Sequence, residues 1–399
     1  MSDRWDAVIA GAGPSGSAAA TLLARGGYRV ALVDRARFPR HKPCGEYLSP
    51  GVVQILERLG LAADIPHAAM HRIDGMDIVS RHGTIFPLTH HPGDPAVSIP
   101  RYDLDNALLA AAVRAGATLF DGTVVHEPVV ENDRVDGLRV GSEGRLRTLD
   151  GRMTLVADGS RSVLAEKLGL ARDLRWPKRI GLVAHFQGQS ALPANRGGMY
   201  IGRTGYCGLA PLAGQRVNVA IVVPLPALRE AGCSAEAYFD RWIASEPLVR
   251  EALGQTVRAS SVRGRAPIGA RAARSWTHGA MLVGDAAGFF DPFTGEGVYR
   301  ALRGAELAAG AATAVLEGER AEVAVLAGYG RDRRRAFGWK QVTTELVQVF
   351  IHYPALTEYI LPRLSHRPRV ARVLTDVLAD KVDARRFVNV RTLIAALAP

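Results

Sequence analysis

The sequence is poor in the features that build secreted, metal-dependent or membrane-spanning proteins. Only 3 of its 399 residues are cysteine, so the thiols cannot all pair, and Cys44, Cys207 and Cys233 lack metal-ligand spacing. Its 11 histidines form no HExxH motif. No run approaches the roughly eighteen uncharged apolar residues of a membrane helix, and the N-terminus begins a strand without the layout of a signal peptide. We therefore expect no disulfide, structural metal or integral membrane segment, and a cytoplasmic location.

Lysine is also scarce, although the formal net charge is +11. The arginines that dominate the 50 basic residues are scattered and do not alternate with aromatic residues. This pattern is typical of a solvated surface, and no nucleic-acid partner is expected. An anionic substrate or a peripheral contact with a membrane surface stays open. The remaining composition, 48% hydrophobic and 22% charged, is that of a globular chain with room for two packed domains.

The first motif lies near the N-terminus. Residues 5–10 (WDAVIA) predict a strand, which leads into Gly11-Ala12-Gly13-Pro14-Ser15-Gly16 and then a helix of small residues, and a second strand ends at Asp34. This order predicts a dinucleotide-binding unit, in which the glycines let a pyrophosphate approach the helix N-terminus and Asp34 accepts hydrogen bonds from a ribose. The motif alone does not separate a nicotinamide from a flavin dinucleotide, because both contain the same ADP half.

Two later stretches make that distinction. TLVADGSRS is a strand that ends at Asp158-Gly159 and turns into a helix. AMLVGDAAGFFDPFTGEG is a strand that ends at Gly284-Asp285, followed by a Pro/Gly loop and a helix from about Gly297. A helix beginning at Arg101 precedes both stretches.

With these motifs in this order across residues 6–310, the chain resembles the flavoprotein superfamily built on the p-hydroxybenzoate hydroxylase fold. The superfamily includes aromatic hydroxylases, flavin-dependent halogenases and geranylgeranyl reductases. The resemblance implies that FAD is the cofactor, that Asp285 binds its ribityl chain, that Arg101 lies near the pyrophosphate or ribityl, and that Asp158 supports the nucleotide site.

The residue chemistry agrees with a flavin. Reduced flavin carries negative charge on one edge, which the backbone N–H groups of the turn at residues 294–297 and the following helix N-terminus would face. Gly295 and Gly297 allow close approach, and Pro292 stiffens the entry. The residues expected to bind the cofactor are Gly11, Gly13, Pro14, Ser15, Gly16, Asp34, Arg35, Cys44, Gly45, Arg101, Val125, Asp158, Gly159, Gly284, Asp285, Pro292, Gly295, Glu296, Gly297 and Val298.

The predicted fold class is α/β: a Rossmann-type FAD-binding domain with an inserted antiparallel β-sheet substrate domain and a helical C-terminal cap. Two interrupting stretches alternate apolar and polar residues between Gly/Pro turns, as strands do, and should form one sheet over the flavin. The segment after Tyr329 spaces its apolar residues at helical intervals. The expected ranges are 1–75, 100–175 and 265–330 for the FAD-binding domain, 76–99 and 176–264 for the substrate domain, and 331–399 for the helical region.

Three residues are candidates for catalysis. Cys44 lies in PCGEYLSP, which resembles the Pro-Cys-Gly segment of geranylgeranyl reductases, and we consider it either a proton donor or a small packing residue. Tyr206 in TGYCGLAPL and His185 in GLVAHFQG are expected to face the cavity from the sheet, together with Cys207.

The favoured reaction is hydroxylation of a hydrophobic phenolic or polyketide-like compound, dependent on NAD(P)H and oxygen. The chain reads GYCGLAPL where geranylgeranyl reductases carry an aromatic Trp-Phe-Pro signature, which argues against prenyl reduction, whereas PCGE and FTGEGV argue for it. A flavin protein that only transfers electrons is the third hypothesis, and halogenation is disfavoured because the halogenase tryptophan motif is absent. There is no second dinucleotide unit, so either NAD(P)H binds transiently or a separate redox protein supplies the electrons, and the oligomeric state stays open.

Overall fold

The structure is a computed structural model that describes residues 4–142, 144–172, 178–318 and 320–388. Its first sheet has the strand order β20-β21-β11-β1-β2-β8, and all neighbours in it are parallel except β20 and β21. The central strands are runs of small and branched apolar residues buried on both faces, as expected for a parallel sheet covered on both sides. The strands are β1 (Trp5–Ala10), β2 (Val30–Val33), β8 (Thr118–Phe120), β11 (Arg145–Val156), β20 (Trp276–Thr277) and β21 (Ala280–Leu282).

Helices cover one face of this sheet and a meander covers the other. The helix face holds α1 (Pro14–Arg25), α3 (Arg101–Arg114) and α8 (Gly297–Leu316), whose buried alanines let the helices pack closely. The opposite face holds β9 (Val124–Glu131) and β10 (Arg134–Ser142), which continue antiparallel into β11. The smaller elements are α2 (Pro50–Arg58), α4 (Val163–Lys167), the sheet β3-β7-β4 (Tyr47–Leu48, Ala96–Ser98, His71–Ile73) and the pair β12-β19 (Ala171–Arg172, Arg271–Ala272).

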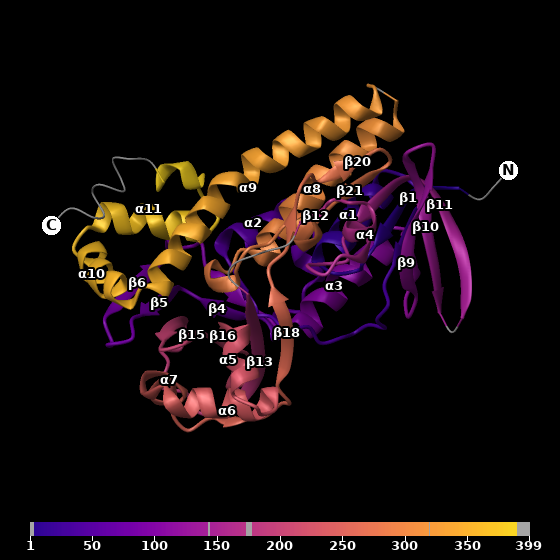
Figure 1. Ribbon diagram of the computed structural model, residues 1–399. Coiled ribbons are helices and arrows are strands. Elements are labelled where there is room, and N and C mark those ends of the chain that lie inside the picture. Colours follow the sequence, from indigo (N-terminus) through magenta and orange to yellow (C-terminus); the bar gives the residue numbers. More distant parts are fainter. Residues whose placement is uncertain (1–3, 143, 173–177, 319, 389–399) are drawn as a thin grey trace.

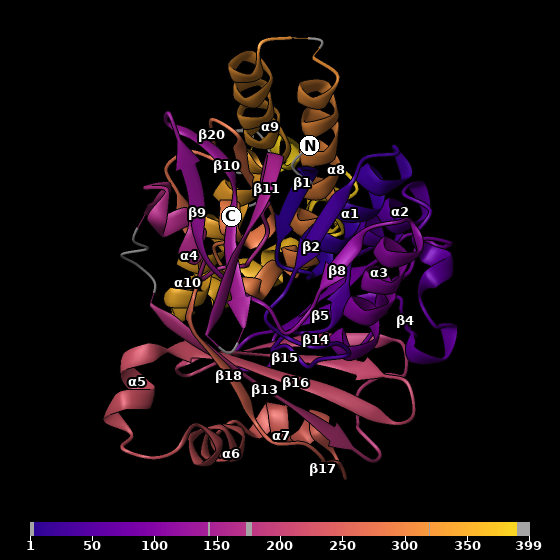
Figure 2. The same cartoon turned by 90° about the vertical axis from the view of Figure 1, so that its right-hand side faces the viewer.

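The second sheet has the order β17-β13-β16-β15-β14-β5-β6, with β18 paired to β13. Its neighbours are antiparallel except β14 and β5, which are parallel and come from separate stretches of the chain. Figure 2 shows this sheet beneath the first, with α5, α6 and α7 on its far side. The elements are β5 (Gly75–Val79), β6 (Ile85–Thr89), β13 (Arg179–Gln187), β14 (Arg196–Gly202), β15 (Gly205–Leu212), β16 (Arg216–Pro224), β17 (Val257–Arg258), β18 (Arg263–Ile268), α5 (Leu225–Glu230), α6 (Ala235–Ser245) and α7 (Pro247–Leu253).

The C-terminal helices cover the inner face of the second sheet. The long helix α9 (Glu322–His352) leads from the first sheet to α10 (Pro354–Ser365) and α11 (Pro368–Leu378), as Figure 1 shows. Their apolar residues join one buried cluster with β5, β6, β15 and β16. Residues 389–399, the end of the predicted helical region, lie outside the described residues. In the described part of the chain, no helix is both long and apolar enough to cross a bilayer.

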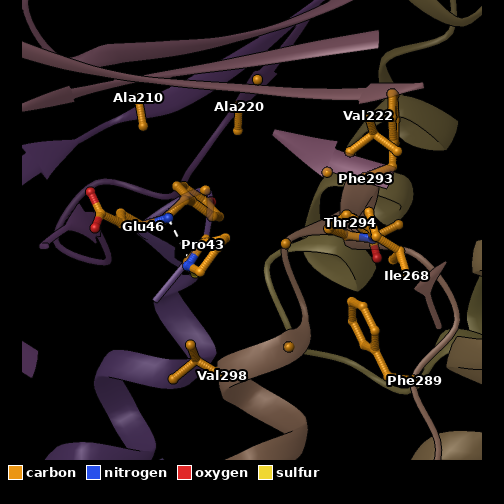
Figure 3. Close-up of a pocket in the computed structure, with 18 of the residues that line it drawn as sticks. Pro43, Glu46, Ala210, Ala220, Val222, Ile268, Phe289, Phe293, Thr294 and Val298 are labelled. Carbon is orange, nitrogen blue, oxygen red and sulfur yellow. Dashed lines mark hydrogen bonds between the residues drawn. The ribbon is translucent and has the colours of Figure 1, made fainter. Parts of the chain in front are cut away.

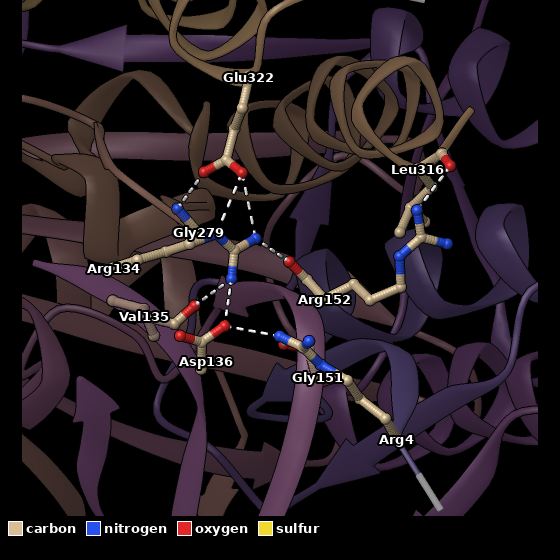
Figure 4. Close-up of polar contacts among 9 residues, drawn as sticks. All are labelled: Arg4, Arg134, Val135, Asp136, Gly151, Arg152, Gly279, Leu316 and Glu322. Carbon is tan, nitrogen blue, oxygen red and sulfur yellow. Dashed lines mark hydrogen bonds and ion pairs between the residues drawn. The ribbon is translucent and has the colours of Figure 1, made fainter. Parts of the chain in front are cut away.

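A polar network anchors the start of α9 to the meander (Figure 4). The Glu322 carboxylate accepts hydrogen bonds from the Arg134 guanidinium at 3.1 Å and from the backbone N–H of Gly279 at 2.5 Å. Arg134 also donates to the Asp136 carboxylate and to the carbonyl of Arg152. The N-terminal turn of α9, where a carboxylate is favoured by the helix dipole, is thereby fixed to the first sheet and its meander.

Candidate active site

A cavity of about 250 Å³ lies between the starts of α1 and α8 on one side and the second sheet on the other. Figure 3 shows Pro43 and Glu46 across this space from Phe293 and Thr294, with Ala210 and Ala220 on the sheet above. Most of the sheet and cap side is apolar. The apolar residues that form it include Met76, Ile78, Leu88, Met199, Val222, Ile268, Phe289, Phe293 and Leu378.

The glycines at the start of α1 have two different roles, in the backbone turn and in access for a ligand. Gly11 has φ +97°, and a Cβ on Gly16 would lie 1.8 Å from the Gly11 carbonyl oxygen. These two glycines therefore allow the tight strand-to-helix turn. A Cβ on Gly13 would meet only the Arg40 side chain at 3.7 Å, and Gly13 lines the cavity. Gly13 thus leaves the N-terminal N–H groups of α1 open to a ligand.

Asp34 lies directly after β2, as the dinucleotide motif requires. Its two carboxylate oxygens accept hydrogen bonds from the backbone N–H groups of Ala12 and Ala36, each at 2.8 Å. The carboxylate thus links the glycine turn to the end of β2. Each oxygen retains a further lone pair that can accept from a hydroxyl.

Cations gather at the nucleotide end of the cavity. Burial and the neighbouring Arg101 guanidinium lower the pKa of Lys42 to about 8. Burial also lowers the pKa of Arg265, whose guanidinium donates to Ser160 Oγ at 2.8 Å. A partly buried cation destabilised by desolvation and by like charge is stabilised by a bound anion. The residues therefore fit the pyrophosphate of a dinucleotide.

Arg101 is held in place by a carboxylate that the sequence analysis did not identify. Its guanidinium makes a bidentate pair with Asp105, one turn later on α3, at 2.6 and 2.7 Å. Asp105 also pairs with Arg40 at 3.0 Å. The i, i+4 spacing was visible in the sequence, but it indicates a pair only once Arg101 is known to be buried.

The turn before α8 forms the other end of the cavity. β21 ends at Leu282, earlier than predicted, because Gly284 adopts φ +61° and starts a 3₁₀ turn that brings Asp285 to the cavity. Gly295 has φ +69°, and a Cβ there would lie 3.0 Å from the Tyr47 ring. Backbone N–H groups and the N-terminus of α8 follow at once. This is the arrangement that stabilises negative charge on a flat ligand.

The loop that contains Cys44 is fixed by Glu46. Glu46 is 5% exposed and has φ 56°. Its carboxylate accepts hydrogen bonds from Asn218 Nδ2 and from the backbone N–H of Arg101, each at 2.9 Å. His185 Nε2 lies 2.7 Å from the same carboxylate. Asn218 also donates to the Cys44 carbonyl at 3.0 Å, and Cys44 lines the cavity. The second sheet therefore holds this loop of the FAD-side domain in place.

The two candidates from the sheet are engaged in polar pairs. Tyr206 lines the cavity, and its hydroxyl donates to Asp291 Oδ1 at 2.5 Å. His185 lies on the same face of the sheet, but its ring is directed to Glu46. The prediction for Cys207 was wrong: it packs on the opposite face with α6, because neighbouring strand residues alternate between faces and Tyr206 takes the inner position.

The predicted cofactor residues divide into two groups. Those that line the cavity are Gly13, Pro14, Ser15, Cys44, Gly45, Arg101, Gly159, Asp285, Pro292, Gly295, Gly297 and Val298. Those that lie outside its lining are Gly11, Gly16, Asp34, Arg35, Val125, Asp158, Gly284 and Glu296. In the second group, Glu296 pairs with Arg300 at 2.9 Å, and Val125 packs against the meander face of the first sheet. Burial raises the pKa of Asp158 to about 6.

Tyr47 and His90 also line the cavity, and the sequence analysis identified neither. The Tyr47 hydroxyl lies 3.0 Å from His90 Nε2, and His90 is 7% exposed. The two residues come from β3 and from the end of β6, far apart in sequence and not part of a motif. Only the fold brings them together.

His90 should make the stability of the protein depend on pH. Burial and the nearby Arg196 lower its pKa from 6.5 to about 4. Between these values the unfolded chain binds a proton that the folded chain does not, so the free energy of unfolding should fall by up to about 3 kcal/mol as the pH drops from 6.5 to 4. The variant His90→Gln should lack this component, which urea unfolding of both apoproteins across the pH range measures. Parallel profiles would contradict the prediction.

The parallel sheet with its glycine turn, the partly buried cations and the turn before α8 fit a protein that binds a flavin dinucleotide. The sequence of residues 4–345 matches the family of FAD binding domains. The chain belongs to this family and is an FAD-dependent oxidoreductase.

Several relatives carry names of reductases. The chain is 30% identical over 328 residues to the menaquinone reductase of Mycolicibacterium smegmatis, covering 77% of this chain and 76% of the relative. It is 30% identical over 401 residues to digeranylgeranylglycerophospholipid reductase 1 of Methanothermobacter thermautotrophicus, covering 98% and 95% of the two chains.

Solved structures agree on the fold. The myxobacterial chondrochloren halogenase is similar with a TM-score of 0.78 and 28% identity, over 84% of this chain and 80% of the halogenase. A flavoprotein/dehydrogenase from Cytophaga hutchinsonii is similar with a TM-score of 0.85 and 20% identity, over 98% and 97% of the two chains. These likenesses support the predicted fold class, and the family match supports FAD as the cofactor.

Proposed function

We propose that this protein reduces a carbon–carbon double bond in a prenyl chain, with NAD(P)H as the electron donor. The observation that carries the proposal is the apolar wall of the cavity, which faces the turn expected to hold the flavin ring. A prenyl chain offers only apolar surface, and such a wall would bind it by excluding water. The relatives named as reductases of digeranylgeranylglycerophospholipid and of menaquinone support the same chemistry.

FAD bound in this cleft would supply a hydride after its reduction. The α1 turn, Lys42 and Arg265 would hold its pyrophosphate, Asp285 its ribityl chain, and the Gly295–Gly297 backbone the edge of its ring. Glu46 fixes the loop that closes one side of this space through its bonds to His185 and Asn218. The substrate would lie between this loop and the second sheet.

Hydroxylation of a hydrophobic phenolic or polyketide-like compound is the second candidate. It is favoured by the stretch GYCGLAPL, which is β15 and lacks the aromatic signature of the prenyl reductases at the cavity. In that case the chain would position an electron-rich ring and keep water away from the flavin. The two candidates differ in their need for oxygen.

The product mass tests both candidates. The FAD-loaded protein is incubated with NAD(P)H, with and without air, against geranylgeranyl compounds, a menaquinone, alkylresorcinols and hydroxynaphthalenes. We expect a gain of two hydrogens in a prenyl compound, and this gain should persist without air. A gain of one oxygen that is lost without air would show hydroxylation instead, and reduction of the flavin without any product would support an electron-transfer protein.

A cavity-filling variant provides the control for this assay. Ala220 lies on β16 and lines the cavity, so Ala220→Phe should fill part of the substrate space. Turnover should fall at least about tenfold while the flavin absorbance of the purified protein stays unchanged. Unchanged turnover would place the substrate elsewhere.

A further inference from the structure

Reduction of a double bond needs a proton as well as a hydride, and the phenol of Tyr47 on the cavity wall is placed to give it. We infer that Tyr47 donates this proton and that His90 is its positioning residue. The inference rests on the proposed reduction of a double bond. The proton-donor hypothesis derived from the sequence named Cys44 instead.

Tyr47 lies at the flavin end of the cavity. Its ring occupies the space that a side chain on Gly295 would fill, at 3.0 Å from the Cβ position of that residue. Gly295 belongs to the turn that would hold the flavin ring. A substrate carbon next to the ring would therefore lie near Tyr47, which is itself part of the cavity wall.

The hydrogen bonds of His90 leave the proton of Tyr47 available. A neutral imidazole has one N–H and one acceptor nitrogen. Nδ1 of His90 is buried and has no partner among the described residues, whereas Nε2 lies 3.0 Å from the Tyr47 oxygen. A buried N–H without an acceptor is rarer than an acceptor without a donor, so we place the proton on Nε2. His90 then donates to Tyr47, and the Tyr47 O–H can point to the substrate.

The Tyr206 phenol on the cavity wall is less suitable. The hydroxyl proton of Tyr206 is committed to Asp291, whose carboxylate also pairs with Arg179 at 2.9 Å. Cys44 is the rival donor: its sulfur accepts the backbone N–H of Glu46 at 3.4 Å, a contact that leaves the S–H free, so the test includes Cys44→Ser. Burial raises the pKa of Tyr47, which keeps this phenol protonated throughout the working pH range.

The step balances as follows. FAD, when bound and reduced, would supply the hydride for one alkene carbon. The Tyr47 proton would form a C–H bond at the other carbon while the π bond and the Tyr47 O–H bond break. The phenolate that remains accepts the Nε2–H of His90. A proton from water then restores the phenol.

The test is the anaerobic reaction of the fully reduced holoenzyme with geranylgeranyl diphosphate, followed by flavin absorbance in H2O and D2O and by product mass. We expect Tyr47→Phe to slow flavin reoxidation about 100-fold or more. Reduction of the flavin by NAD(P)H and the affinity for FAD should not change. Tyr200→Phe is the control, because Tyr200 is a partly buried tyrosine that packs on the outer face of the second sheet, away from the cavity.

Two further measurements separate a chemical role from a structural one. The wild type should show a solvent isotope effect on flavin reoxidation, which depends on the transferred proton. His90→Gln should retain part of the rate of flavin reoxidation, because the glutamine amide can still donate to Tyr47. His90→Phe has no donor at this position and should lose that remaining rate.

Different outcomes overturn different statements. If Tyr47→Phe reoxidises within threefold of the wild type with an unchanged isotope effect, or if the loss follows Cys44→Ser instead, the assignment of Tyr47 is wrong. If the wild type reduces neither geranylgeranyl diphosphate nor a menaquinone but hydroxylates a phenol in air, the proposed reduction is wrong, and the assignment fails with it.

Discussion

Gly16→Ala should lower the free energy of unfolding of the apoprotein by about 3 kcal/mol or more and prevent the retention of FAD. The added Cβ would lie 1.8 Å from the Gly11 carbonyl oxygen, a backbone atom that cannot move without opening the turn between β1 and α1. Gly11 is itself restrained, because its N–H donates to the Val33 carbonyl at 2.7 Å. Urea unfolding of the apoprotein and the flavin absorbance of the purified protein measure the two effects.

Gly13→Ala is the matched control from the same motif. Its Cβ would make only an ordinary contact with Arg40, and its backbone is extended, so the apoprotein should be as stable as the wild type. FAD affinity should still fall, since the added methyl group lies where the pyrophosphate would approach. Equal loss of stability in both variants would contradict the distinct roles of the two glycines.

The second large effect is expected at a buried ion pair that joins the C-terminal helices to the FAD-side domain. Lys340 on α9 pairs with Asp380, which follows α11, and donates to the Val377 carbonyl at 3.0 Å. Ser49, the N-cap of α2, donates to the same Asp380 carboxylate at 2.5 Å. Lys340→Met would leave that carboxylate buried without its cation and should lower the free energy of unfolding by about 3–5 kcal/mol.

The pH dependence of this loss provides a check on its cause. Burial raises the pKa of Asp380, so in Lys340→Met the folded state takes up a proton more readily than the unfolded state. The stability deficit relative to the wild type should therefore grow as the pH rises. The double variant Lys340→Met/Asp380→Asn should recover part of the loss, since asparagine tolerates the positive φ of 61° at this position. If the loss of stability in Lys340→Met is the same at all pH values, and the double variant is no more stable than Lys340→Met, the loss is due to packing and not to the unpaired carboxylate.

Local patterns were enough to predict the parts of the site that depend on backbone. The glycine turn, the strand ends and the start of α3 at Arg101 follow from steric limits and apolar periodicity within short segments. The order of three such motifs was enough to predict the flavin fold and its cofactor. The exact end of β21 was not predictable, because it depends on the positive φ of Gly284.

Side-chain partners were the part that the sequence did not reveal. Glu46 bonds to residues from β13 and β16, and Lys340 pairs with a residue 40 positions later that only the packing of α11 brings close. Cys207 was misplaced because alternation along a strand assigns a face only when the register is known.

The sequence by itself therefore determined that this protein binds a dinucleotide in a Rossmann-type domain, since the turns that hold a dinucleotide are built from consecutive residues, and the family resemblance carried by three motifs identified the dinucleotide as FAD. Only the tertiary structure decided which side chains meet at the cavity, such as Tyr47 with His90. The physical reason is the distance along the chain over which each interaction acts. Glycine conformation and strand or helix periodicity act over a few neighbours, whereas hydrogen bonds and burial in the cavity depend on segments that folding brings together from β3, β6, α8 and the C-terminal helices.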